Sequence, residues 1–330
     1  MYPVDSSILH AGITEMVVHR RGFEHEAFLY SGLEEFLLGT VPLVRAAVAS
    51  GEATLVIVGP EKREALRQQL AGDVDGVVFE DMSVVGRNPA HLIPMWQGFL
   101  ADHSSSGRRV RGIVEPVWAG RSASELSECA RHEALLNVAF GEPNFSLLCP
   151  YDVASLQPEA IEVARRNHPV LRDPSGVAPS PGFTGTFAVT TVEALPDPPA
   201  APVVLGFGPE DLPNVRGTVS RWARAAGMSS DRRSDLVTAV NEVATNSIRH
   251  GGGGGTLRLW KETGRLVCEV TDGGRVEDLL ADRRPPLLRS GRGYGLWISN
   301  QLCDLVQLRP THAGNVVRLH KAVRTPPAGT

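Results

Sequence analysis

Short apolar runs alternate with amphipathic stretches through the first half of the chain. The run at 53–58 is almost entirely apolar and stops at a Gly-Pro pair, and the stretch at 62–70 repeats its apolar residues at helical spacing. Apolar strands that alternate with helices predict an α/β domain with a doubly wound, mostly parallel sheet covered on both faces. Further strands are predicted at 76–79, 110–116 and 145–150, and further helices at 94–103 and 122–140.

The second half has a different order of elements. Two helical patterns come first, then two strands, a glycine-rich segment, a helix and two last strands. This order predicts an α+β sandwich, with helices on one face of a largely antiparallel sheet. The helices are predicted at 212–227, 230–251 and 294–303, and the strands at 256–262, 266–272, 304–309 and 315–321.

A stretch dense in Pro and Gly, 173–202, separates the two halves. Pro removes backbone donors and Gly raises the entropy cost of ordering, so this stretch is expected to resist packing. Within it, 183–192 alternates in a way that is compatible with one strand of the second domain. We predict an N-terminal domain over 1–173, a linker over 174–202 and a C-terminal domain over 203–330.

The composition is that of a globular protein with two domains. Its 330 residues are 42% hydrophobic and 21% charged, and 33 basic against 37 acidic side chains give a net charge of −4. Mild acidity disfavours direct nucleic-acid binding, and no run is long enough for a membrane span or a signal peptide. Cys129, Cys149, Cys268 and Cys303 form no CxxC pair, which disfavours a zinc signature and a disulfide framework. We expect a cytoplasmic protein.

The segment 235–250 carries the strongest chemical signal. Its apolar residues follow helical spacing, and Glu242, Asn246 and His250 lie one turn apart along a neighbouring face. The Asn oxygen is a neutral, hard ligand of the kind that Mg²⁺ prefers, and the Glu can take a proton from a nucleophile that approaches a γ-phosphate. Taken alone, the same pattern also fits a surface helix with these residues on its polar face.

Two glycine-containing segments follow this helix. Asp272 ends a strand before two glycines, so its carboxylate could accept a hydrogen bond from an adenine amino group, although Asp-Gly-Gly is often only a turn. Gly291, Gly293 and Gly295 precede the last helix, and backbone amides at a helix N-terminus favour phosphate. This second segment is neither a Walker loop nor a dinucleotide fingerprint.

Together, Glu-x3-Asn-Ser-x2-His, Asp-Gly-Gly and Gly-Arg-Gly-Tyr-Gly-Leu resemble the GHKL ATPase family over about 205–325, and most closely its anti-sigma-factor serine/threonine kinases. The resemblance implies ATP and Mg²⁺ as cofactors, with Glu242 as general base, Asn246 as Mg²⁺ ligand and Asp272 on the adenine amino group. It also implies a glycine lid over the phosphates. The further ATP-binding residues that it implies are Arg249, His250, Gly274, Gly291, Gly293, Tyr294, Gly295 and Leu296.

Two positions depart from the family's pattern. Arg275 and Val276 follow the Asp-Gly-Gly turn where a further glycine is usual, and 314–318 lacks the threonine that usually supports the adenine site. These changes bear on nucleotide affinity more than on fold. A histidine kinase is disfavoured, because His132-Glu133 lacks the usual following proline and no long helical hairpin precedes the second domain.

The N-terminal half resembles the MEDS sensory domain over about 20–170, on segments that include 23–31 and 112–121. The resemblance implies a RecA-like or doubly wound domain that has no phosphate loop and senses a small ligand. Ligands of open α/β sheets bind beyond the carboxyl ends of the strands, which predicts a sensory pocket there. Its candidate residues are His25, Glu26, Glu115, Trp118, Arg121, His132, Cys149 and Tyr151, with Glu133 and Asp152 beside them.

Structural interpretations of these side chains stay open. Glu115 and Arg121 could form an ion pair, with Trp118 capping the core. A metal in the sensory domain is disfavoured, because no two of its His, Cys and Glu candidates have the spacing of ligands on one helix or hairpin.

These features predict a ligand-responsive anti-sigma regulatory factor. Its expected partners are a sigma factor and a STAS-type antagonist protein, whose Ser or Thr receives the γ-phosphoryl group of ATP, and a homodimer is the expected assembly. The alternative is a non-catalytic module, with ATP or nothing in its pocket, that sequesters its partner under the control of a small ligand. A metabolic enzyme is disfavoured, because no nucleophile–base pair is recognisable. The sequence leaves open which ligand is sensed and whether it raises or lowers kinase activity.

Overall fold

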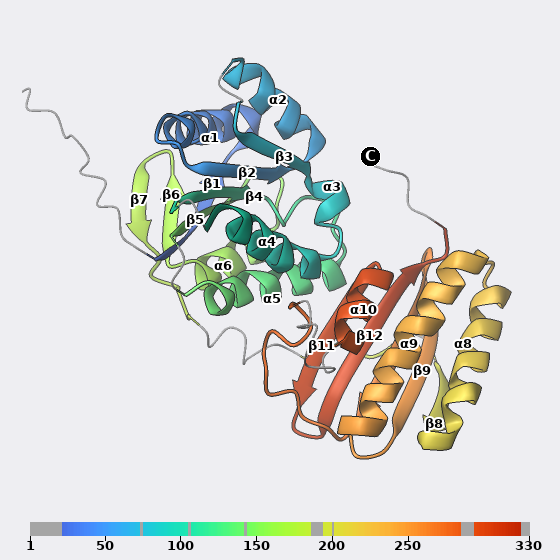
Figure 1. Ribbon diagram of the computed structural model, residues 1–330. Helices are drawn as coiled ribbons and strands as arrows, with labels where there is room; N and C mark the ends of the chain where they lie inside the picture. Colours follow the sequence, from blue (N-terminus) through green and yellow to red (C-terminus); the bar gives the residue numbers. More distant parts are fainter. Residues whose placement is uncertain are drawn as a thin grey trace, which may run out of the picture.

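The computed structural model describes residues 22–72, 75–104, 107–141, 144–185, 194–199, 201–284 and 294–324. They form two domains, and the N-terminal domain contacts the part of the C-terminal domain that carries α10 (Tyr294–Leu302) and β11 (Leu305–Thr311) (Figure 1). Among the described helices, none combines the length and the apolar content that crossing a bilayer requires.

The N-terminal domain is built on a seven-stranded sheet with the order β3-β2-β4-β5-β1-β6-β7. All neighbouring strands are parallel except β7, which pairs antiparallel with β6. The strands are β1 (Phe23–Tyr30), β2 (Ala53–Val58), β3 (Val77–Asp81), β4 (Val110–Val114), β5 (Phe145–Asp152), β6 (Val170–Asp173) and β7 (Gly176–Pro179).

Helices cover both faces of this sheet, and strand β2 shows why. Its six residues are all buried, and their side chains alternate between two cores. Leu55 and Ile57 pack on the α4–α6 side, whereas Val56 and Val58 pack on the α1–α2 side. The predicted doubly wound, mostly parallel sheet is therefore confirmed. Its helices are α1 (Gly32–Ala49), α2 (Pro60–Leu70), α3 (Met82–Val85), α4 (Leu92–Ser104), α5 (Ala123–Ala139) and α6 (Pro158–Asn167), with a 3₁₀ turn η1 (Pro89–His91).

The predicted linker needs a correction at its start. β7 lies inside 174–202 and pairs with β6, because the Pro and Gly residues there form the turn of a hairpin. Asp173 stabilises that turn by accepting from the backbone and hydroxyl of Ser175, and Gly176 has a φ of 144°, which favours glycine. Of the possible strand at 183–192, residues 186–192 lie outside the described residues.

The C-terminal domain has a five-stranded antiparallel sheet with the order β11-β12-β10-β9-β8. Its helices all cover one face, as Figure 1 shows, and Leu266, Cys268 and Val270 of β10 face them in a single core. The predicted α+β sandwich is confirmed. The elements are β8 (Val203–Phe207), η2 (Pro209–Asp211), α8 (Leu212–Ala225), α9 (Ser230–His250), β9 (Gly255–Glu262), β10 (Arg265–Asp272), α10, β11 and β12 (Gly314–Ala322).

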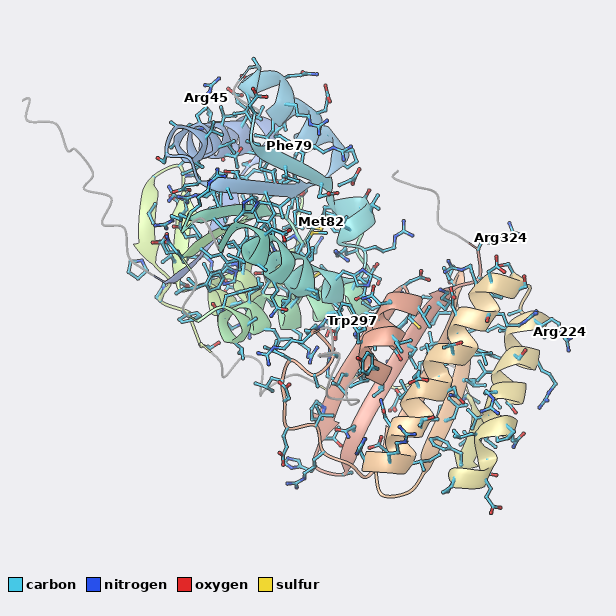
Figure 2. The ribbon with its side chains drawn as sticks, viewed as in Figure 1. Arg45, Phe79, Met82, Arg224, Trp297 and Arg324 are labelled. Atoms are coloured by element: carbon cyan, nitrogen blue, oxygen red, sulfur yellow. The ribbon has the colours of Figure 1, made fainter. Side chains whose placement is uncertain are left out.

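Side chains fill the interior of both domains (Figure 2). Met82, at the start of α3, is buried in the N-terminal core, whereas Arg224 and Arg324 point away from the C-terminal domain into solvent. On the far face of the C-terminal sheet, Arg318 donates to the carbonyl of Pro196 at 2.8 Å, so the described part of the linker follows that face.

Candidate functional site

Asp272, at the end of β10, is the centre of the polar site in the C-terminal domain. Its half-buried carboxylate accepts hydrogen bonds from the Ser247 hydroxyl (2.6 Å), the Gly274 backbone N–H (2.9 Å) and the Asn315 amide (3.1 Å). These donors come from α9, the turn after β10, and β12. They fix the direction of the carboxylate.

Close approach of the backbone around Asp272 explains three glycines. A Cβ at Gly251 would lie 2.6 Å from the Asp272 Cγ, and a Cβ at Gly274 would lie 2.6 Å from the carbonyl oxygen of His250. At Gly314 a Cβ would lie 1.7 Å from the carbonyl oxygen of Asp272. The glycines of and around the Asp-Gly-Gly turn therefore allow the end of α9 to pack against the end of β10.

A cavity of about 510 Å³ opens beside Asp272, within the size range of small-molecule sites. Of the predicted ATP residues, Asn246, His250, Asp272 and Leu296 line it. The other lining residues are Val243, Gly251, Arg275, Val276, Glu277, Asp278, Ala281, Leu308, Asn315 and Val317. Arg275 and Val276, the residues that depart from the family's glycine pattern, are thus part of its wall.

Asn246 is held by the start of α10. A Cβ at Gly295 would lie 2.5 Å from the Asn246 amide nitrogen, so the glycine leaves space for this position of the carboxamide. Ser299 reinforces the contact by donating to the carbonyl of Ala239 at 3.2 Å. The last glycine of the Gly-Arg-Gly-Tyr-Gly-Leu segment therefore lies against the predicted Mg²⁺ ligand.

The remaining predicted ATP residues are not among those that line the cavity. Glu242 is half-buried one turn before Asn246, and within the described part of the chain its carboxylate has no hydrogen-bond or ion-pair partner. Arg249 is exposed near the end of α9, and half-buried Tyr294 begins α10. Gly291 and Gly293 lie outside the described residues.

Asn315 is a site residue that sequence reasoning missed. It lies directly opposite Asp272 in the β10–β12 register, in the stretch that lacks the expected threonine. Its amide donates to Asp272, and its own carbonyl oxygen is buried without a partner among the described residues. An asparagine therefore supports the carboxylate where a threonine is usual.

The cavity fits a nucleotide and a hard cation. Asp272 offers an acceptor for an exocyclic amino group, and apolar Val243, Leu296 and Val317 suit a flat base. The Asn246 carboxamide supplies the kind of oxygen that Mg²⁺ accepts together with waters and phosphates.

The predicted sensory residues divide into three separate groups. In the first, Glu115 accepts from Tyr30 (2.8 Å) and from Lys62, beyond the ends of β1 and β4. Burial raises the pKa of the Glu115 carboxyl, although the ammonium of Lys62 opposes this. The ion pair is thus with Lys62 and not with Arg121.

Arg121 and Trp118 form the second group, in the loop before α5. The Arg121 guanidinium stacks on Trp118, 3.6 Å from its ring centre, and donates to the carbonyls of Pro116 (2.7 Å), Gly86 (2.6 Å) and Arg87 (3.2 Å). Burial lowers the pKa of this guanidinium. All three of its nitrogens bind backbone, so Arg121 orders two loops.

The third group is a fully buried cluster that joins His25, Glu133, Cys149 and His168, hereafter the His/Cys cluster. The Glu133 carboxylate lies 3.1 Å from His25 Nε2 and 3.0 Å from His168 Nε2, and Cys149 Sγ lies 3.4 Å from His25 Nε2. Burial lowers the pKa of His25 and raises that of Cys149. His168 was not predicted from the sequence.

The other candidates lie beside this cluster or away from it. Tyr151 packs edge-on against His168, and its buried hydroxyl has no partner among the described residues. His132 is also buried without a partner there, and burial lowers its pKa to about 3. Glu26 points to the opposite face of β1 from His25 and pairs with Arg172 at 2.9 Å.

Buried charges on α5 join the sensory side to the C-terminal domain. Arg131 donates to both carboxylate oxygens of Asp282 (3.0 and 3.1 Å), and Glu128 accepts from Arg283 (2.7 Å) and from Arg309 of β11. Burial opposes ionisation of Asp282, but Arg131 and Arg283 outweigh it and hold the pKa of its carboxyl low. No sequence pattern indicated this contact.

Residues 279–283, hereafter the docked segment, complete this interface. Leu280 is buried in the core of the N-terminal domain, although it belongs to the chain segment that leaves the cavity wall. Asn300 of α10 donates to the carbonyl of Asp282 (2.9 Å) and accepts from Asn88 (3.1 Å). The wall of the cavity is therefore anchored in the neighbouring domain.

The C-terminal domain matches the family model of the histidine kinase-like ATPase domain over residues 207–321. Residues 24–169 match the model of the methanogen/methylotroph DcmR sensory domain, MEDS. The chain joins a MEDS domain to a GHKL-type ATPase domain, and both predicted resemblances are confirmed.

Two curated relatives match part of the chain. They are anti-sigma F factors of Clostridium botulinum, from strain Eklund 17B (type B) and strain Alaska E43 (type E3). Each is 35% identical over 92 residues, which cover 24% of this chain and 64% of the relative.

Proposed function

We propose that the protein is an anti-sigma regulatory factor that transfers the γ-phosphoryl group of ATP to a Ser or Thr of a STAS-type antagonist protein. The observation that carries this proposal is the arrangement on α9. A half-buried Glu242, unpaired within the described chain, lies one turn from Asn246, which lines a nucleotide-sized cavity. The similarity of part of the chain to anti-sigma F factors supports the anti-sigma role.

Each step of the reaction has a residue suited to it. Asp272, held by Ser247 and Asn315, accepts the adenine amino group, and Asn246 would hold Mg²⁺. When bound, Mg²⁺ offsets the charge of the phosphates. Glu242 orients the attacking hydroxyl and takes its proton, which an unpaired carboxylate can do.

The sensory domain would act on this site through the docked segment. Asp282 and Arg283 are held by α5, and the same stretch of chain continues from the cavity wall at Glu277, Asp278 and Ala281. A ligand that displaces α5 would therefore move the wall. The proposed response is a change in nucleotide affinity or transfer rate that depends on the Arg131–Asp282 contact.

A second function is favoured by the cavity wall itself. Arg275 and Val276 stand where glycine is usual, and Asp272, Glu277 and Asp278 bring three carboxyl groups to a site for an anion. A module that binds its partner without transfer would tolerate these changes. In that case, a sigma factor would be sequestered whether or not ATP is turned over.

One pair of variants separates these functions. Calorimetric titration with Mg²⁺-ATP is expected to give micromolar binding for the wild type and for Glu242→Gln, and weak binding for Asn246→Ala. Transfer from labelled ATP to an antagonist protein should be lost in Glu242→Gln if the protein is a kinase. Retained repression of a sigma factor by the same variant, without any transfer by the wild type, would instead establish sequestration.

A further inference from the structure

The His/Cys cluster brings together four different elements of the N-terminal domain. His25 lies on β1, Glu133 on α5, Cys149 on β5, and His168 directly after α6. One potential ligand atom from each lies within 4.8 Å of all the others, and all four residues are at most 1% exposed. Such a convergence is invisible to local spacing rules.

Hydrogen bonds at the outer edge of the cluster fix the tautomers of both imidazoles. His25 Nδ1 lies 3.1 Å from the Asn137 side-chain oxygen, while the amide nitrogen of Asn137 donates to the Asn167 carbonyl. His168 Nδ1 lies 2.8 Å from the carbonyl of Ala164. Each Nδ1 therefore carries a proton and donates it outward, as metal-binding histidines commonly do.

The inner nitrogens are left facing an acceptor. In a neutral imidazole whose Nδ1 is protonated, Nε2 has only a lone pair. Both Nε2 atoms nevertheless lie 3.0–3.1 Å from the same Glu133 oxygen, with the Cys149 sulfur beside them. Within the described chain, Glu133 Oε1 and His168 Nε2 make no hydrogen bond, which is unusual for polar atoms so deeply buried.

We propose that His25, Glu133, Cys149 and His168 bind one Zn²⁺ ion in a closed, four-coordinate site. Two imidazole nitrogens, a carboxylate oxygen and a thiolate are ligands that zinc accepts. Bond lengths of about 2.0–2.3 Å place tetrahedral ligand atoms about 3.3–3.6 Å apart, so the cluster needs shifts of only a few tenths of an ångström for its closest pairs. On binding, the Cys149 thiol releases its proton to solvent and its sulfur bonds to the metal.

The first experiment measures the metal directly on the full-length protein. After dialysis against a chelator, titration with Zn²⁺ is expected to restore one ion per chain, as measured by inductively coupled plasma mass spectrometry. X-ray absorption of the zinc-loaded wild type should show one sulfur at about 2.3 Å and nitrogen or oxygen neighbours at about 2.0 Å. Bound zinc without a sulfur neighbour, or no bound zinc, would overturn the proposal.

The second experiment assigns the ligands. Co²⁺ replaces zinc in such sites and, bound by a thiolate, should give a charge-transfer absorption that Cys149→Ser abolishes. His168→Gln should weaken binding at least about tenfold, the lower limit seen even for outer-shell partners. Cys129→Ser is the matched control, because Cys129 is equally buried in the same domain but its sulfur contacts the Pro116 carbonyl. Equal cobalt spectra for Cys149→Ser and Cys129→Ser would contradict the site, and circular dichroism checks that each variant is folded.

Discussion

The carboxylates of Asp272 and of the pair Glu128 and Asp282 show two uses of buried charge. Asp272 is half-buried at a cavity, with three donors on one side and open space on the other. Glu128 and Asp282 are fully buried, and both form ion pairs with arginines. The open carboxylate is suited to binding a ligand, whereas the closed ones are suited to holding two domains in one geometry.

The difference follows from what surrounds each charge. Donors with no net charge hold Asp272, so a ligand's amino group can complete its hydrogen bonding without competing against an ion pair. Three arginines offset the cost of burying Glu128 and Asp282: Arg131, Arg283 and Arg309. These ion pairs leave no hydrogen-bonding position on the carboxylates for a ligand. Whether neutral donors or arginines surround a carboxylate therefore decides which role it can have.

Breaking the closed pair should have the largest effect. Glu128→Gln removes a charge without creating a cavity, and leaves Arg283 and Arg309 buried beside an amide. We expect the free energy of unfolding to fall by about 3–5 kcal/mol, as for other broken buried pairs. Urea unfolding measures the loss, with Glu162→Gln, an exposed glutamate on α6, as control. Equal stability of the two variants would mean that the network contributes nothing.

Breaking the open carboxylate should affect binding instead of folding. Asp272→Asn replaces an acceptor that is charged, and hydrogen bonds to charged groups contribute about 1.5–3 kcal/mol. Affinity for Mg²⁺-ATP should therefore fall about 10- to 150-fold while the unfolding temperature changes little. Calorimetric titration measures this loss. A variant that binds as tightly as the wild type would show that adenine lies elsewhere.

His320 is a buried histidine that stays neutral in the folded protein at neutral pH. Burial, helped by Arg265 and Arg318, lowers its pKa to about 3, from an ordinary value of 6.5. The unfolded chain takes up this proton first, so stability is complete above about pH 6.5 and falls as the pH drops, by up to about 1.4 kcal/mol per pH unit.

The matching variant isolates this one histidine from the others. His320→Gln should reduce the slope of unfolding free energy against pH between about pH 6 and 4. Hydrogen exchange of β12 peptides in urea at several pH values measures the slope in this domain. Parallel curves for the wild type and the variant would place the proton uptake at another group.

The smallest expected effect concerns the support of Asp272. Asn315→Ala removes one donor to the carboxylate and one free acceptor, and should weaken Mg²⁺-ATP binding by about 0.5–1.5 kcal/mol. Asn315→Thr restores a donor and should recover part of that loss. The same titration measures both variants, and a threonine variant weaker than the alanine variant would show that Asn315 acts only by its size.

In the C-terminal domain the sequence could predict which side chains share one face of a helix, because these residues are close in sequence. Their roles in nucleotide binding stay predictions. Glu242, Asn246 and His250 share one helix, and their spacing shows which face they occupy. Asn315 was missed because its role depends on strand register, which pairs it with Asp272 across 43 residues. Register is set by the whole sheet and not by the local pattern.

The sensory side could be predicted only in part, for the same reason. The sequence favoured the carboxyl ends of the parallel strands, where Glu115 and Tyr30 do meet. The His/Cys cluster instead lies near the amino ends of β1 and β6, which the sequence did not predict. His25 and Cys149 are 124 residues apart and adjacent across β1 and β5, and His168 lay in a helix end that had not been predicted. The sequence analysis disfavoured a metal because it considered only ligand spacing within one helix or hairpin. That criterion cannot detect contacts between residues that are distant in sequence.

The burial of Leu280 limits how freely this ATPase domain could be exchanged between proteins. A domain that is joined to a new sensor in evolution usually brings a complete surface of its own. Here Leu280 and two charged residues near it, Asp282 and Arg283, are buried against the N-terminal domain. Any new sensor domain would have to bury these three residues in the same way. These two domains are therefore expected to have been inherited as a pair.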